Sequence, residues 1–124
     1  MNVKTDTKEK FHAITVLDHS LSANMTEDLA GYLLPYLENP VKNVVLIMNQ
    51  VKDIDQAAAE KLVYIQQKFY ENSASFVCCE LRKPVEDFLD QQELLEMMNV
   101  TPTESEAWDI VQMEEIEREY LDGE

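Results

Sequence analysis

The pattern of apolar and polar residues along the chain predicts strands that alternate with helices. Two short β-rich runs come first, Val3 to Asp6 and Phe11 to Leu17, and the polar turn Thr7 to Lys10 between them favours a hairpin at a sheet edge. Two continuous apolar runs follow, NVVLIM at 43–48 and SFVCCEL at 75–81. Runs of this kind are typical of central strands that are covered on both faces.

Four segments repeat apolar residues at three- and four-residue steps, which predicts amphipathic helices. Ser22 or Asn24 is the expected N-cap of the first helix, and Asp55 is that of the second. Pro35 is expected to kink the first helix or to shorten its last turn. A T-x-x-E capping box that starts at Thr103 begins the fourth helix. The apolar positions of the four helices are, in order, Met25, Leu29, Leu33, Tyr36 and Leu37; Ala58, Leu62, Ile65 and Phe69; Val85, Phe88 and Leu89; and Ala107, Trp108, Ile110 and Val111.

With a short strand around Val100, the order of elements is β-β-α-β-α-β-α-β-α. This alternation predicts an α/β fold, in which a mixed, mostly parallel sheet with an edge hairpin packs against about four helices. The length of 124 residues fits one domain. We expect the domain to span residues 1–124, with a core at about 11–112 and an acidic C-terminal helix tail at 113–124. From Glu114 onward acidic residues dominate, and the tail is expected to fray into solvent.

The formal net charge of -15 changes which partners are plausible. It argues against nucleic acid and against anionic membrane surfaces, because both are bound by clustered Lys and Arg. The charges are either simply solvated or complementary to a basic docking face on a partner. The N-terminal segment has no apolar core of a signal peptide, no run is long enough to span a bilayer, and Cys78 and Cys79 are adjacent without a further cysteine. These features predict a cytoplasmic location.

Residues that could carry catalysis are scattered. His12 and His19 have no metal-ligand spacing, no serine lies in a nucleophile-elbow pattern, and no Gly-rich loop is present. Asp53 and Asp55 are close in sequence, but beside a helix start they are expected to cap it rather than to share a proton. Trp108 is either core filler or an exposed interface anchor. We therefore expect no catalytic residue, no cofactor and no metal, and a protein that is not an enzyme.

Three segments, in the right order and at the right spacing, resemble the STAS domain family of anti-sigma factor antagonists. The first is VVLIMNQVKDIDQAAAEKL at 44–62, which is similar to the family's apolar strand, loop, Asp-Ser-Ser-Gly motif and helix. The second, at 75–98, is similar to the strand, third helix and leucine-rich turn that follow. The third is TPTESEAW at 101–108, close to the family's entry into the final helix. The resemblance covers roughly residues 11–112.

The resemblance implies a phosphorylation switch that this chain does not retain. In the family, the second hydroxyl residue of the Asp-Ser-Ser/Thr-Gly motif is phosphorylated by a partner kinase, which is itself the anti-sigma factor. Here the motif is Asp55-Gln56-Ala57-Ala58, so Ala57 occupies the acceptor position and carries no oxygen. Ile47 stands where family members commonly have Asp or Asn. A phosphate would add charge to a packed interface and disrupt docking, and we predict that this control is absent.

The resemblance also implies a partner-binding surface at the carboxyl ends of the parallel strands, where loops gather on one rim. Arg82 and Lys83 are among few basic residues there and could equally form a solvated loop. The predicted partner-binding residues are Asn49, Asp53, Asp55, Gln56, Ala57, Ala58, Arg82 and Lys83. The implied function is a non-enzymatic interaction module, a monomer or weak homodimer, that binds a kinase-like anti-sigma factor or a signalling complex. Alternatives are an accessory subunit of an ABC lipid-transport system and a sensor of a small ligand or nucleotide.

Overall fold

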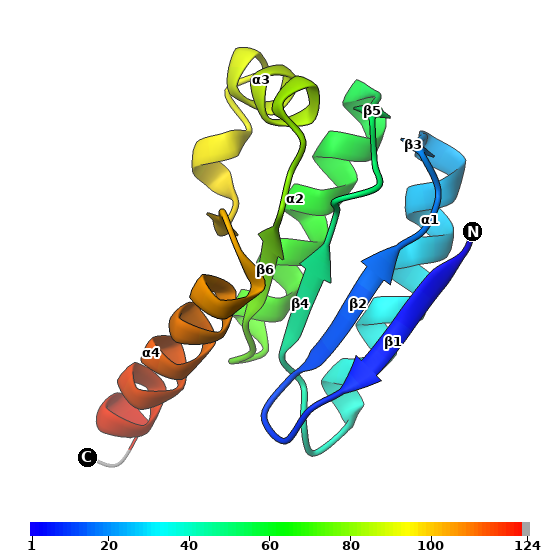
Figure 1. Cartoon of the computed structure of the whole chain (residues 1–124). Helices are drawn as coiled ribbons and strands as arrows, with labels where there is room; N and C mark the ends of the chain where they lie inside the picture. The colour runs from blue at the N-terminus through cyan, green and yellow to red at the C-terminus, as the bar shows by residue number, and fades with distance from the viewer. Residues whose placement is uncertain (123–124) are drawn as a thin grey trace.

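A computed structural model describes the backbone of residues 1–122 and the side chains of residues 1–120 (Figure 1). The strands are β1 (Val3–Thr7), β2 (His12–Val16), β3 (Ser20–Leu21), β4 (Val44–Ile47), β5 (Asp53–Ile54), β6 (Phe76–Cys79) and β7 (Val100–Thr101). The α-helices are α1 (Ala23–Leu33), α2 (Gln56–Glu71), α3 (Lys83–Gln91) and α4 (Glu104–Asp122), with 3-10 turns η1 (Leu34–Glu38) and η2 (Leu95–Met97). The predicted α/β alternation is confirmed, and Pro35 shortens α1 as expected, because the chain continues past Leu33 as η1.

Five of the strands form one sheet in the order β1-β2-β4-β6-β7. The β1–β2 pair is the predicted antiparallel edge hairpin, and the other pairs are parallel. Because side chains alternate along a strand, each face has its own core. On β2, Ile14 and Val16 join the larger core under α1, α2 and α3, whereas Ala13, with Phe11 just before the strand, joins the smaller core under α4. Figure 1 shows α1 and α2 behind the sheet and α4 beside β6, extending toward the lower left.

The helix stripes that face these cores follow the sequence pattern. The predicted stripe of α2 is fully buried at Ala58, Leu62, Ile65 and Phe69. Leu29 and Leu33 of α1, like Val85 and Leu89 of α3, are also fully or almost fully buried. Trp108 packs against the smaller core, with its ring stacked on that of Phe11 at 5.1 Å between centroids. It therefore behaves as core filler.

Two short strands were not predicted. β3 pairs with β5 in a separate two-stranded parallel sheet, through Ser20 with Asp53 and Leu21 with Ile54. This sheet lies beyond the carboxyl ends of β2 and β4 (Figure 1). Two-residue strands have no periodicity that a sequence pattern could reveal.

The acidic tail does not fray across the described residues, so the prediction of a frayed segment from Glu114 onward was wrong. α4 continues to Asp122. The reason is that the carboxylates of Glu114 and Glu115 accept hydrogen bonds from Ser75 and Asn43, which lie just before β6 and β4. Within the described part of the chain, none of the helices has both the length and the apolar character that crossing a membrane demands.

Candidate functional site

The loops after β4 and β6 lie together because these strands are parallel neighbours, with Ile47 opposite Cys79. Beyond the strand ends, the backbone carbonyl of Asn49 accepts a hydrogen bond of 2.8 Å from Nε of Arg82. The side-chain amide of Asn49 donates to the carboxylate of Glu80 at 3.2 Å. The structure therefore brings together Asn49 and Arg82, two of the residues that the sequence placed on one rim.

Asp55 lies at the centre of this rim and links the first turns of two helices. As predicted, it is the N-cap of α2, where its Oδ1 accepts a hydrogen bond of 2.8 Å from the backbone N–H of Ala58. Its Oδ2 accepts from the backbone N–H of Ala23, in the first turn of α1, at 3.3 Å. Ser22 is the N-cap residue of α1 by backbone position, but its side chain makes no capping bond. The sequence could not reveal this shared role, because Ala23 and Asp55 are far apart along the chain.

The first turn of α2 presents a small and uncharged surface. Gln56 and Ala57 are exposed, so Ala57, which the sequence resemblance aligns with the family's acceptor residue, presents only a methyl group to solvent. Ala58 is fully buried. This agrees with the place of Ala58 in the predicted apolar stripe, beside Leu62, and it packs into the larger core. Its assignment to the partner-binding surface does not fit, because its side chain is not accessible.

The other two predicted residues lie at the margins of the rim. Asp53 is exposed in β5, where its backbone pairs with Ser20. Lys83 is exposed in the first turn of α3, and its Nζ donates to Oδ1 of Asp87 at 2.9 Å. That hydrogen bond raises the pKa of the Lys83 ammonium above its ordinary value. The charge of Lys83 is thus directed toward its own helix, whereas the guanidinium of Arg82 braces the loop at Asn49.

The thiols nearest the rim are buried and protonated. Cys78 and Cys79 point to opposite faces of β6, one into each core. Burial raises the pKa of Cys79 to about 12 and raises that of Cys78 as well. A protonated thiol is a poor nucleophile and a poor metal ligand. Among residues whose side chains are described, no group of three or more His, Cys, Asp or Glu comes together in a metal-binding arrangement.

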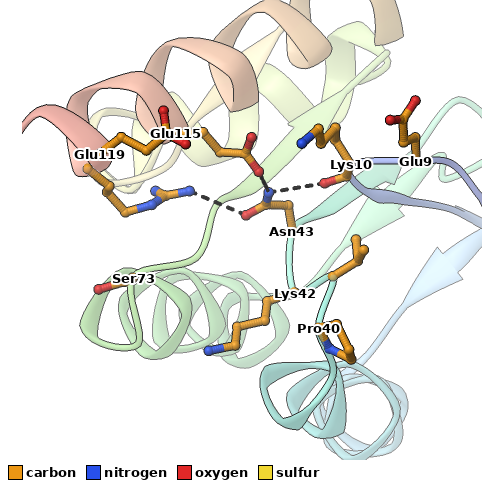
Figure 2. A pocket seen from close by; sticks show the side chains of 10 residues that line it. Glu9, Lys10, Pro40, Lys42, Asn43, Ser73, Glu115 and Glu119 are labelled. Carbon is orange, nitrogen blue, oxygen red and sulfur yellow. Dashed lines mark hydrogen bonds between the residues drawn. The ribbon is translucent and has the colours of Figure 1, made fainter. Parts of the chain in front are cut away.

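A hollow at the opposite end of the sheet, with a volume of about 480 Å³, is lined by a polar cluster that the sequence did not reveal (Figure 2). At its base, the side-chain amide of Asn43 donates to the carbonyl of Lys10 at 3.1 Å and to Oε1 of Glu115 at 2.7 Å. Its Oδ1 accepts from the backbone N–H of Ser75 at 2.8 Å. Across the described side chains, every buried polar atom has a hydrogen-bond partner. This cluster holds α4 against the strand starts, and its hydrogen bonds are made within the protein.

Comparison with known proteins agrees with this fold. A sequence model of the STAS domain matches residues 2–107. An anti-sigma factor antagonist from Thermotoga maritima is 16% identical, with a TM-score of 0.75 over 89% of this chain and 94% of that one. The antagonist SpoIIAA, a Bacillus cell fate determinant, in its unphosphorylated form is 12% identical, with a TM-score of 0.70 over 90% and 96% of the two chains. No curated protein sequence matches this chain.

A third similarity extends to a much larger protein. The murine Solute Carrier 26 family member A9, an anion transporter, is 12% identical, with a TM-score of 0.68 over 84% of this chain and 18% of the transporter. At such identities the solved structures establish the shared fold alone. The sequence match covers most of the chain. The chain belongs to the STAS domain family.

Proposed function

We propose that this chain is a non-enzymatic, cytoplasmic interaction module of the anti-sigma factor antagonist type, which binds a regulatory protein without phosphorylation control. The observation that carries the proposal is the first turn of α2. Ala57 is exposed at the position of the family's acceptor hydroxyl, and the carboxylate of Asp55 already accepts a hydrogen bond from the backbone N–H of Ala58. A helix start that binds its own carboxylate, and has no hydroxyl to modify, suits a permanent docking surface.

The rim around this turn supports the same function. Arg82 and Asn49 hold the two strand-end loops in a fixed relation through a bond of 2.8 Å. A preorganised loop loses less conformational entropy when a partner binds. The proposed contact surface comprises Asn49, Asp53, Gln56, Ala57, Arg82 and Lys83, with Asp55 as the residue that positions the helix start. The partner class that fits is a kinase-like anti-sigma factor or a signalling complex that contains one.

The test begins with the partner that co-purifies from the native cell and measures its affinity for variants by calorimetry. Ala57→Glu places a negative charge where the family has its phosphate, and we expect binding to weaken roughly tenfold or more. Ser105→Glu is the matched control, because Ser105 is also exposed in the first turn of a helix, α4. If both variants bind equally well, the first turn of α2 is not the docking surface.

The absence of phosphorylation control is tested separately, by measuring the intact mass of the protein after incubation with the co-purified kinase and ATP. The segment 53–60 has no Ser, Thr or Tyr, so we expect no phosphate there. Ala57→Ser restores an acceptor hydroxyl, and this variant is expected to gain one phosphate and then to lose affinity. A phosphate on wild-type protein that weakens binding would contradict the proposal, wherever it is attached.

The similarity to an anion transporter favours a second candidate, an accessory role in membrane transport, of which a subunit of an ABC lipid-transport system is one form. The same co-purification distinguishes the two. A transport ATPase or permease that elutes with this chain, in place of a kinase, supports the second candidate. A small-ligand sensor is tested by heating the pure protein with nucleotides and lipids, because a bound ligand raises the melting temperature.

A further inference from the structure

The second half of α4 has its apolar and polar sides reversed. A surface helix normally turns its apolar stripe toward the core and its polar side toward solvent. Here Met113, Ile116 and Tyr120 recur at three- and four-residue steps along the outward side, and they are 55%, 63% and 74% exposed. The first half of the same helix is ordinary, because Ala107 and Val111 are fully buried against the sheet.

Polar contacts hold the inward side of this half. Oε1 of Glu114 accepts a hydrogen bond of 2.6 Å from the hydroxyl of Ser75, and its Oε2 accepts from the amide of Asn99 at 3.1 Å. Arg118 donates to the same hydroxyl at 3.2 Å. Glu115 accepts from the side-chain amide of Asn43, as Figure 2 shows. The helix is therefore fixed in place without the three outward apolar side chains, which the fold of the domain does not use.

The charge around this outward stripe determines which partner fits. Between residues 104 and 120 the chain carries seven carboxylates and one Arg. Asp109, Glu117 and Glu119 are exposed beside the apolar stripe. Like charges disfavour a second copy of this acidic helix and disfavour an anionic membrane, whereas Lys and Arg bordering an apolar surface would be attracted.

We propose that the outward stripe of α4, formed by Met113, Ile116 and Tyr120, docks a basic amphipathic helix of a partner protein. The apolar side of that helix would cover the three side chains, and its flanking Lys and Arg would pair with Asp109 and Glu117. In Figure 1, α4 begins beside β6 and runs away from the end of the sheet where β3, β5 and α3 lie. This surface is therefore separate from the rim at Asp55, and its use does not depend on the function proposed for that rim.

The test uses a synthetic helical peptide of leucine and lysine, labelled with fluorescein, and follows its binding to the whole chain by anisotropy. The triple variant M113S/I116S/Y120S is expected to weaken binding roughly tenfold. The matched control is Y64S/Y70S/M97S, which removes three other exposed apolar side chains. Tyr64 lies beneath Lys61 and Lys68, whose Nζ atoms are 4.6 and 5.4 Å from its ring centre, so two cations lie over this ring. The control is expected to bind within about a factor of two of wild type.

A second variant, D109N/E117Q, keeps the apolar stripe and removes two carboxylates. We expect it to weaken binding and to reduce the loss of affinity with added salt. Amide chemical shifts locate the peptide, and those that move are expected in 109–120 and not in 49–58. Equal loss in both triple variants, or shifts confined to another surface, overturns the proposal. So does self-association of wild type that the stripe variant abolishes, or binding to uncharged lipid vesicles that exceeds binding to the peptide.

Discussion

Asn43 and Asn49 lie at opposite ends of β4 and have opposite environments. Asn43 is 5% exposed and its side chain joins the start of β2, the start of β6 and α4. Asn49 is exposed, and its side chain makes one bond, to Glu80 in the neighbouring loop. The same residue type is buried where the second half of α4 covers the strand starts, and exposed where the rim is open. The domain thus has a sealed end, where buried hydrogen bonds at the base of the hollow hold α4 over the strand starts, and an open end, where the strand-end loops are exposed.

The largest expected effect comes from breaking the sealed end. Asn43→Ala leaves the buried N–H of Ser75 and the carboxylate of Glu115 without their partner, and we expect the free energy of unfolding to fall by about 2–4 kcal/mol. Chemical denaturation measures it. Asn49→Ala is the matched control and should change stability by no more than about 0.5 kcal/mol. Equal effects for the two variants would remove the distinction between the ends.

The second prediction tests whether solvent enters the core beneath the rim, at Cys79. Cys79 is the last residue of β6, and burial raises the pKa of its thiol to about 12. The ordinary pKa of a thiol is about 8.5. Below that pH both the folded and unfolded states are protonated, and above it only the unfolded thiol ionises. The free energy of unfolding should therefore fall as the pH rises above about 8.5. One pH unit above that value, each buried thiol should account for a loss of about 1.4 kcal/mol.

Urea denaturation across this pH range measures the slope. Cys79→Ala is expected to be less stable at neutral pH, because it leaves a small cavity, but to lose less stability as the pH rises. A slope that does not change in this variant would indicate that solvent reaches the thiol from the open end.

The third prediction concerns the residue that gives the open end its shape. Asp55→Ala removes the cap of α2 and the bond to the first turn of α1, and we expect a loss of about 1–2 kcal/mol of stability. Asp55→Asn keeps one oxygen for the N–H of Ala58 but cannot also accept from the N–H of Ala23, so its stability should fall between those of wild type and Asp55→Ala. Asp53→Ala is the control for charge alone, since Asp53 is exposed two residues earlier. Thermal denaturation that ranks Asp53→Ala as low as Asp55→Ala would contradict the linking role.

The sequence predicted features that depend on nearby residues and missed those that depend on distant ones. The stripe of α2, the cap at Asp55 and the capping box at Thr103 depend on neighbours a few residues away, so local spacing was sufficient. The bond between Asn43 and Glu115 joins residues 72 positions apart, and no local pattern reports it. The acidic tail was expected to fray because acidic residues dominate it. Their partners are supplied by the starts of distant strands.

The sequence predicted those parts of the candidate surface whose positions follow from the order of the strands. Parallel strands bring their carboxyl ends together, so the contact of Asn49 with Arg82 followed from strand order. Local spacing placed Ala58 correctly on the buried stripe of α2. Its place in the partner-binding surface came from the motif of the family, which does not say which side chain of the first turn faces solvent. The placement of the outward apolar stripe of α4 could not be predicted, because Met113, Ile116 and Tyr120 are spaced as a core-facing stripe would be.

The smallest expected effect on stability is at the open end itself. Arg82→Ala removes the bond of 2.8 Å to the carbonyl of Asn49, between two exposed residues. We expect the free energy of unfolding to change by no more than about 0.5 kcal/mol, while hydrogen exchange of the amides at 49–52 becomes faster. Arg82→Lys keeps the charge but lacks the Nε–H that donates this bond, so it should behave like Arg82→Ala in exchange. If Arg82→Lys instead matches wild type, the charge and not the bond orders the loop, and the rim is then held by electrostatics rather than by a fixed contact.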